Sequence, residues 1–434
     1  MDRRSGSTVS RILEEARDRF LALAGEAPPA GGLALLREVG LEAFAEQGLP
    51  DTKQEEWRYT RLTPLAEIAW TNAPAAIGVK QSSLEAAAEP VFGCEPVVFV
   101  DGRHRAGLPG GAGAGEVAAL AESAEAPALL GTLAEARSHP FVGLNGALCQ
   151  DGARVTLRGE APCLVHLVFA EATEAAASHP RVLIEAAPGS RGTVIVDHVS
   201  LEETTHLANA VLEVEVGANA SLDLVVLQRQ GKRSFHAGHV AGRVERDGRL
   251  RTHTLTLGGA FVRNDLVVTL VGEGAECAMK GLYLGTGEEL IDNHTWIDHS
   301  VPQCRSDELY KGVLAGRSQG VFRGRVVVRP DAQKTEAQQS NPNLLLSDDA
   351  EIDSKPQLEI YADDVKCSHG SAIGRLDPEA LFYLRSRGID VDEARALLTR
   401  GFAGEVLAAL PEPTLAEAVG ALFSERLERA GESP

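Results

Sequence analysis

A loose repeat of turns and strands in the middle of the chain constrains the fold more than any other feature. A turn of small or polar residues precedes an aliphatic strand at Gly192, Ala220, Gly248 and Ala275, which are 28, 28 and 27 residues apart. No helical pattern of ten or more residues separates these strands. Such a period is typical of stacked β-coils, because each coil buries its inner face only against its neighbours. We therefore predict a parallel β-helix. A β-sandwich is the alternative, and it does not require even spacing.

Helical patterns lie on both sides of these strands in the 434-residue chain. Apolar residues recur with helical spacing before the strands, in residues 10–24 and 33–47, and after them, in residues 378–387, 392–410 and 414–430. We predict a mainly β chain with a β-helix core flanked by helical regions. The predicted divisions are an N-terminal helical region, 1–90, the β-helix core, 91–375, and a C-terminal helical region, 376–434.

Composition excludes several classes of function. The chain has 42 Lys and Arg against 62 Asp and Glu, a formal net charge of −20. Broad binding to nucleic acid or to an anionic membrane needs clustered positive charge, so we expect neither partner. No apolar stretch approaches the length of a transmembrane helix, about 18 residues, and the first residues lack the apolar core of a secretory signal. We expect a cytoplasmic protein.

The cysteines give no sign of a disulfide framework. The chain has six, which form no CxxC pair and no dense cluster, as expected in a reducing compartment. Five of them lie in aliphatic or turn surroundings and are expected to be small core residues: Cys94, Cys149, Cys163, Cys277 and Cys304.

The most chemically loaded segment is EIYADDVKCSHG, residues 359–370. It places Cys367 two residues before His369, so on a strand both side chains point to the same face. A thiolate and an imidazole together form half a site for a soft or borderline metal. Closed zinc or iron–sulfur sites use about four ligands. The hypothesis is therefore a site shared between subunits; the alternative is a partly buried cysteine beside a surface histidine.

The remaining polar segments are weaker candidates. Two histidine pairs lie in short polar runs: His294 and His299 in IDNHTWIDH, and His236 and His239 in FHAGH. For both pairs we favour polar residues at strand edges and turns over a ligand cluster. For the acidic run 348–353 we favour a solvated turn over a cation site. Residues 338–341, QQSN, are predicted to connect stacked coils through side-chain amides. The chain contains no phosphate-binding GxxxxGK[ST] loop, so nucleotide hydrolysis is not expected.

Three segments resemble one known family. Residues 347–389 (SDDAEIDSKPQLEIYADDVKCSHGSAIGRLDPEALFYLRSRGI), residues 334–346 (KTEAQQSNPNLLL) and residues 53–60 (KQEEWRYT) resemble the SufB/SufD family of iron–sulfur (FeS) cluster assembly proteins. The resemblance is tight over the first of these segments and loose over the whole chain.

The resemblance implies a fold, partners and a site. It implies a right-handed parallel β-helix that pairs with SufB, binds the SufC ATPase through the C-terminal helical region, and forms a homodimer when isolated. It implies a scaffold, not an enzyme, that contributes to iron acquisition and holds no cofactor stably alone. A nascent iron–sulfur cluster or iron would be shared with SufB at the interface. His369 matches the family's interface histidine, and Cys367 is its neighbour.

Two departures favour the SufD branch of this family over the SufB branch. SufB-like chains carry Thr-Gln-Cys-Asp-Ser where this chain has residues 338–342, QQSNP, and Glu-His-Glu where it has Ser368-His369-Gly370. The subunit is therefore expected to be unable to hold a full cluster alone. The alternatives are a SufB-like cluster scaffold and a carbohydrate-active β-helix enzyme, against which the acidity and the missing secretory signal argue.

Overall fold

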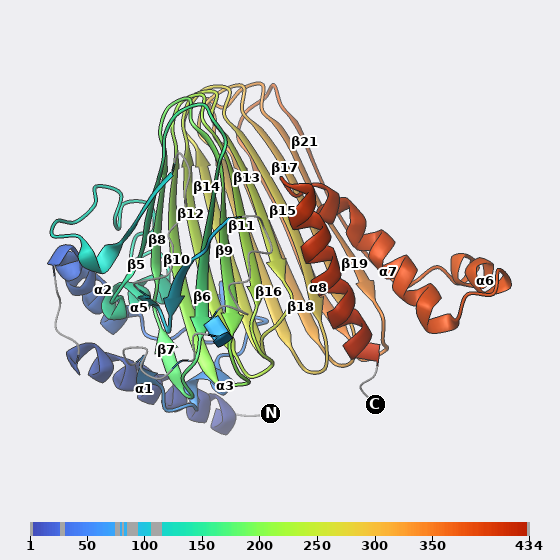
Figure 1. The fold of residues 1–434 in the computed structure, drawn as a ribbon, viewed down its shortest axis with the longest axis horizontal. Coiled ribbons are helices and arrows are strands. Elements are labelled where there is room, and N and C mark those ends of the chain that lie inside the picture. The colour runs from blue at the N-terminus through green and yellow to red at the C-terminus, as the bar shows by residue number, and fades with distance from the viewer. Residues whose placement is uncertain are drawn as a thin grey trace.

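The middle of the chain is a β-solenoid of about eight coils. Figure 1 shows the coils stacked side by side. The structure is a computed structural model that describes residues 3–26, 31–73, 79, 82–84, 94–105 and 115–431. Each coil contributes one strand to each of two sheets, called sheet A and sheet B. Every strand after β9 therefore pairs with the strands two before and two after it in sequence, where both exist. The prediction of a β-helix is confirmed, and the sandwich alternative is wrong.

The two sheets are almost entirely parallel. Sheet A contains β1 (Thr71–Asn72), β4 (Gly115–Ala119), β5 (Gly152–Leu157), β7 (Ala176–Ser178), β8 (Arg181–Ala186), β10 (His206–Val216), β12 (Phe235–Val244), β14 (Phe261–Leu270), β16 (Leu290–His299), β18 (Gln319–Val328) and β20 (Glu351–Ile360). Sheet B contains β2 (Val97–Val100), β3 (Arg103–His104), β6 (Cys163–Glu171), β9 (Arg191–Ser200), β11 (Ser221–Arg229), β13 (Arg249–Thr256), β15 (Glu276–Gly285), β17 (Arg305–Leu314), β19 (Glu336–Leu345) and β21 (Lys366–Gly374).

The coil length varies more than the sequence repeat predicts. In sheet B, Ser221 pairs with Arg249 and Arg249 with Glu276, steps of 28 and 27 residues as expected. The preceding step, from Arg191 to Ser221, is 30 residues, so Gly192 is aligned with Leu222 and not with Ala220. The first marker of the repeat was therefore placed two residues too late. The turns between strands absorb these differences, because only the strands must stay in register.

Alternate strand residues fill the space enclosed by the two sheets, called the lumen. Most lumenal residues are aliphatic, such as Val194 and Val196 on β9 and Leu222 and Leu224 on β11, all fully buried. Parallel strands covered on both faces are expected to be rich in Val, Ile and Leu. The low aromatic content of the chain, 5%, agrees with a narrow lumen filled by such side chains.

The N-terminal elements cover part of the outer face of sheet A. Phe20, Phe44, Trp57 and Phe141 pack with Phe235 and other outward-facing residues of the coils. The N-terminal elements in question are α1 (Arg3–Glu26), η1 (Gly31–Leu33), α2 (Ala34–Gln47), η2 (Glu55–Trp57), α3 (Thr63–Ala66), η3 (Leu120–Glu122) and α5 (Pro140–Leu148). The predicted boundary between residues 90 and 91 lies outside the described residues.

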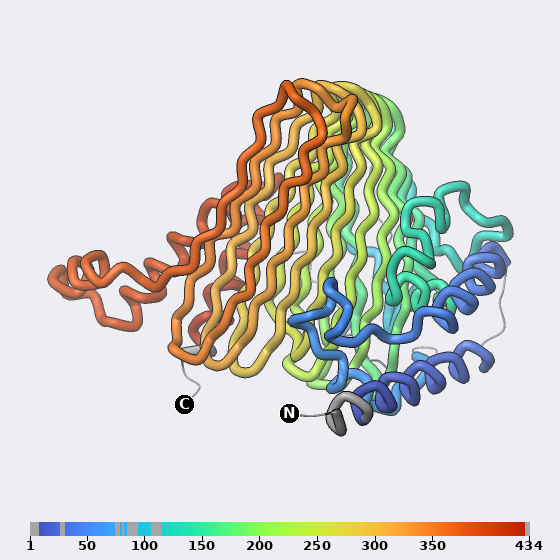
Figure 2. Tube along the Cα trace, turned by 180° about the vertical axis from the view of Figure 1, so that it is seen from behind, coloured from blue at the N-terminus to red at the C-terminus, as the bar shows by residue number. Residues whose placement is uncertain are grey.

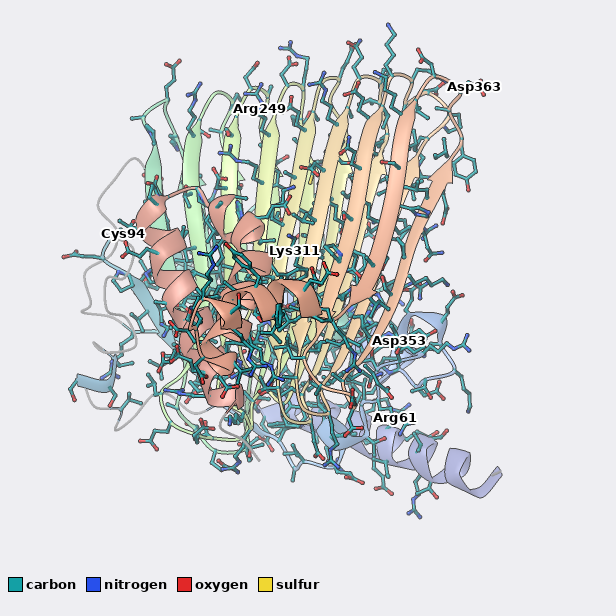
Figure 3. All side chains as sticks on the ribbon, turned by 90° about the vertical axis from the view of Figure 1, so that its right-hand side faces the viewer. Arg61, Cys94, Arg249, Lys311, Asp353 and Asp363 are labelled. Carbon is teal, nitrogen blue, oxygen red and sulfur yellow. The ribbon has the colours of Figure 1, made fainter. Side chains whose placement is uncertain are left out.

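Two C-terminal helices cover the outer face of sheet B, and a third projects from the body. Helices α7 (Val391–Ala408) and α8 (Pro413–Gly431) lie against the coils in Figure 3, where Lys311 of β17 lies beneath them. The Lys311 ammonium donates a hydrogen bond to the carbonyl of Phe402, 3.0 Å away, and pairs with Glu405 at 2.7 Å. Helix α6 (Pro378–Ser386) extends away from the solenoid in Figures 1 and 2. In the described part of the chain, no helix is both long and apolar enough to cross a membrane.

The two ends of the solenoid differ. At the first coils, the antiparallel pairs β2–β3 and β4–β5 cover the sheet edges. At the other end, β20 and β21 are the last strands of sheets A and B, and among the described strands each pairs with a single strand of its own sheet. Figure 2 shows this last coil at the free edge of the stack. An uncovered strand edge of this kind is a ready template for pairing with another chain.

Candidate functional site

The structure places Cys367 and His369 in the last coil, on strand β21. Their partners in the preceding coil are Ala337 for Cys367 and Gln339 for His369. Cys367 packs on the lumenal cluster that contains Ala337, and Ser371 donates a hydrogen bond to Ser354 across the lumen at 2.8 Å. Since alternate residues of a strand share a face, His369 lies on the lumenal side between them. The two candidate residues therefore share the face that the open end presents.

The two side chains differ in exposure and in readiness to bind a metal. His369 is exposed, and Cys367 is half-buried. Burial raises the pKa of the Cys367 thiol above its ordinary value, so the thiol is protonated at neutral pH. Only a thiolate is a good metal ligand. In the isolated chain His369 is therefore the more available ligand, and Cys367 needs a metal or a nearby cation to lose its proton.

Two polar residues lie below His369 in the lumen, one on each of the two preceding coils. Gln339 is 3% exposed and Glu308 is 1% exposed. Glu308 is the register partner of Gln339, and the Gln339 amide Nε2 donates a hydrogen bond to Glu308 Oε2 over 2.6 Å. Burial raises the pKa of Glu308 to about 7. His369, Gln339 and Glu308 therefore occupy matching register positions on three successive coils, counted inward from the last coil.

The raised pKa of Glu308 predicts a pH-dependent stability. The folded state holds this proton more tightly than the unfolded state, whose glutamates titrate near 4.5. The stabilisation is complete below pH 4.5 and is lost as the pH rises through 7, at a cost of about 3 kcal/mol. Glu308→Gln removes this titration, so the variant should gain stability relative to the parent chain between pH 5 and pH 8. Urea unfolding of both proteins at pH 5 and at pH 8 measures the difference in their free energies of unfolding. The same difference at both pH values would contradict the prediction.

A second cluster of ionisable groups lies on the outer face of sheet A, beneath the N-terminal elements. Arg263 of β14 donates two hydrogen bonds to Asp265, each 2.8 Å long, and one of 2.6 Å to Asp292 of β16. His294 pairs with Asp292 at 3.0 Å. Burial would lower the pKa of His294, but Asp292 and Glu56 together outweigh burial, and the pKa is raised. The cluster is a closed network of opposite charges.

The prediction of strand edges and turns is wrong for His239 and His294, which lie in the middle of strands β12 and β16. His236 is the second residue of β12, and His299 is the last residue of β16. His299 faces the lumen, where its Nε2 lies 2.9 Å from the Ser306 hydroxyl. Burial keeps the rings of His236, His239 and His299 neutral, whereas the pKa of His294 is raised by its acidic neighbours. Burial lowers the pKa of His239 to about 3 and that of His299 to about 4.

The chemistry of the cluster disfavours a metal site, although His139, His239 and Asp265 bring three ligand atoms within 4.8 Å of one another. Arg263 already occupies both oxygens of Asp265 and places a positive charge beside the group. The Phe141 N–H donates to His139 Nδ1 over 3.3 Å, which leaves the ring proton on Nε2, the atom that faces Asp265. We therefore assign this cluster a structural role.

The other candidates are mostly structural too. Cys149, Cys163, Cys277 and Cys304 are buried, as expected, whereas Cys94 is only partly buried. The acidic run 348–353 begins with the exposed Asp348 and Asp349 in the loop before β20, and its last three residues belong to that strand. The amides of residues 338–341 do connect coils, but through unlike partners, as when Asn341 donates to the Tyr310 carbonyl over 2.9 Å. The sequence analysis did not identify Glu308 or Arg263. The only sign of either residue in the sequence was a charged residue within a strand whose other residues alternate between apolar and polar.

Comparison with known proteins identifies a family. The model of the SUF system FeS cluster assembly SufBD core domain matches residues 168–402. The iron–sulfur cluster assembly protein SufD of Escherichia coli is 33% identical over 394 residues, which cover 89% of this chain and 91% of that protein. A SufBD family protein of Synechocystis is 30% identical over 403 residues, covering 87% of this chain and 88% of the relative. SufD of Bacillus subtilis is 29% identical over 280 residues, 63% of each chain.

Proposed function

Because the chain belongs to the SufBD family of iron–sulfur cluster assembly proteins and is of the SufD type, we propose that it is a non-enzymatic scaffold subunit that pairs with a SufB partner. The observation that carries the pairing is the uncovered last coil, which presents His369 beside two unpaired strand edges. Nascent iron–sulfur cluster or iron is the cargo, bound between the two subunits.

The open end is suited to pairing through both backbone and side chains. Strands β20 and β21 present one side of their backbones without a further strand. Ile360 and Ile373 lie at this end and are 42% and 54% exposed, unlike the apolar residues that fill the inner coils. A second solenoid placed end to end would supply the missing coil, pair the strand edges and bury these side chains. A homodimer of the isolated chain would use the same surface.

The proposed interface also explains why the site is incomplete in one chain. His369 and Cys367 offer two ligands, whereas iron–sulfur sites use about four. The partner would supply the others, and His369 would bind from this side. Iron bound there would also favour the Cys367 thiolate, because a coordinated thiol loses its proton.

The C-terminal helices are the proposed binding region for the SufC ATPase. Helix α6 stands away from the body, and its Phe382 and Tyr383 are 73% and 57% exposed. Exposed aromatic side chains are frequent anchors of protein interfaces. Helices α7 and α8 use their apolar residues against sheet B, so α6 is the part of this region that is free to dock a partner.

Co-purification with SufB and SufC, followed by iron and sulfide analysis, tests the proposal. We expect the parent chain to retain both partners and the cargo. His369→Ala should retain both partners but lose iron and sulfide by about tenfold or more, because a ligand is removed. The matched control is His104→Ala, on β3 at the other end of the solenoid. A His369→Ala complex with undiminished cargo would contradict the assigned role.

A separate variant tests the contact with SufC. Phe382→Asp should abolish SufC retention and leave pairing with SufB unchanged, because the side chain is exposed on α6 and is not part of the strands of the last coil. Truncation after Gly374 is a poorer test, since it would uncover the apolar face of sheet B that α7 and α8 bury. Pull-down with tagged SufC gives the readout, and Leu35→Asp on α2 is the control. Full retention of SufC by Phe382→Asp would remove α6 from the interface.

A further inference from the structure

Gln339 carries a buried oxygen whose hydrogen-bonding capacity is not used within the part of the chain that the structure describes. Its amide nitrogen donates to Glu308, but the buried Oε1 has no hydrogen-bond partner among the described residues. A buried acceptor without a partner costs about 1–3 kcal/mol. Such an unpaired acceptor needs an explanation. One explanation is a hydrogen-bond donor that reaches it only in another state of the protein, such as a complex.

The neighbours of Gln339 limit the directions from which Oε1 can accept a hydrogen bond. Glu308 lies on the coil below and binds the amide nitrogen, so the amide cannot turn its oxygen toward Glu308 without losing that bond. Across the lumen lies Gly324, where a Cβ atom would come within 2.2 Å of Gln339 Nε2. Because Gly324 has no side chain, the Gln339 amide can occupy this space.

The residue on the other side of Gln339 is His369. It is the register partner of Gln339 on the next coil, and both face the lumen. Neighbouring strands lie about 4.8 Å apart, which places an imidazole nitrogen within reach of an amide oxygen on the next strand. In the isolated chain His369 is exposed, so water can hydrogen-bond to its ring. A partner that covers the last coil would remove that water and leave Gln339 Oε1 as the nearby acceptor.

We propose that Gln339 is a positioning residue for His369: its Oε1 accepts a hydrogen bond from one imidazole N–H and leaves the other nitrogen for iron at the subunit interface. Glu308 orients the amide from below. Histidines that bind metals usually donate their second ring N–H to a carbonyl or carboxylate, which sets the tautomer and the ring orientation. The inference rests on the proposed function, because it assigns His369 its orientation in the paired state.

The test is an anaerobic Fe(II) titration of the reconstituted complex with SufB and SufC. Gln339→Leu should weaken iron binding by about tenfold or more, the usual effect of removing such a supporting group. Gln339→Glu combined with Glu308→Gln keeps an acceptor oxygen for His369 and a hydrogen bond between the two side chains, so this double variant should retain most of the affinity. Gly324→Ala alters no polar group but displaces the amide, so it should also weaken binding. The matched control is Gln338→Leu, an exposed glutamine that faces away from the lumen on the same strand.

A double-mutant cycle separates positioning from an independent effect. If Gln339 acts through His369, Gln339→Leu should cause no further loss in the His369→Ala background. Iron affinity unchanged by Gln339→Leu, or losses that add in the double variant, would overturn the inference. If His369→Ala itself leaves iron binding intact, the proposed function of the site fails. If His369→Ala weakens binding and Gln339→Leu does not, only the positioning role fails.

Discussion

A chain in which both Ile360 and Ile373 are replaced by aspartate is expected to fold normally but to lose pairing with SufB by about 100-fold or more. Both side chains are substantially exposed at the last coil, so the substitutions remove no contact on which the isolated chain depends heavily. In the paired state they would place two carboxylates in an apolar, desolvated interface. A cost of about 3 kcal/mol corresponds to roughly a 100-fold weaker affinity, and an unpaired buried charge costs at least that much.

Sedimentation of the mixed subunits at micromolar concentration measures the effect, and circular dichroism checks the fold. Leu35→Asp is the matched control, because Leu35 is 68% exposed on α2, on the opposite side of the molecule from the last coil. The same double variant should also abolish self-association of the isolated chain. Pairing at the parental affinity would show that the open end is not the interface.

The architecture was predictable from the sequence because its signal is local and repeated. Turns before aliphatic strands recur at nearly constant spacing, and a coil cannot bury its inner face without a neighbour. The helices followed from amphipathic spacing and from caps such as Asp377, whose side chain accepts from the Glu379 N–H over 2.9 Å. The exact coil length was not predictable, since turns of different length produce the same strand register.

The buried polar residues were harder to predict because their partners are distant in sequence. Asp292 accepts hydrogen bonds from Arg263 and from Thr60, which is 232 residues away. No pattern near IDNHTWIDH predicts either contact. Glu308 lies in RSDELYKGVL, where alternation marks it as inward-facing only once the register with Gln339 is known. The sequence therefore located Cys367 and His369 but not the two residues beneath His369. The divisions at residues 90 and 375 stay predictions.

The largest loss of stability is expected from Arg263→Met. This guanidinium is 1% exposed, binds Asp265 and Asp292, donates to the Glu56 carbonyl over 3.0 Å and lies 4.1 Å from the centre of the Trp57 ring. It holds the pKa of Asp265 well below its ordinary range, against the opposing effect of burial. Methionine fills a similar volume but leaves the buried Asp265 carboxylate without its guanidinium partner and leaves Asp292 paired with His294 alone. Breaking a buried ion pair in this way costs about 3–5 kcal/mol.

Urea unfolding at pH 7, followed by circular dichroism and tryptophan fluorescence, measures this loss. Arg243→Met is the matched control, because Arg243 pairs with Glu215 at a partly exposed site of sheet A and should cost less than about 1 kcal/mol. Adding Asp265→Asn and Asp292→Asn to Arg263→Met should recover part of the stability, since the buried carboxylate charges are then removed. If the triple variant is no more stable than Arg263→Met, the loss arises from packing around Trp57 and not from the buried carboxylates.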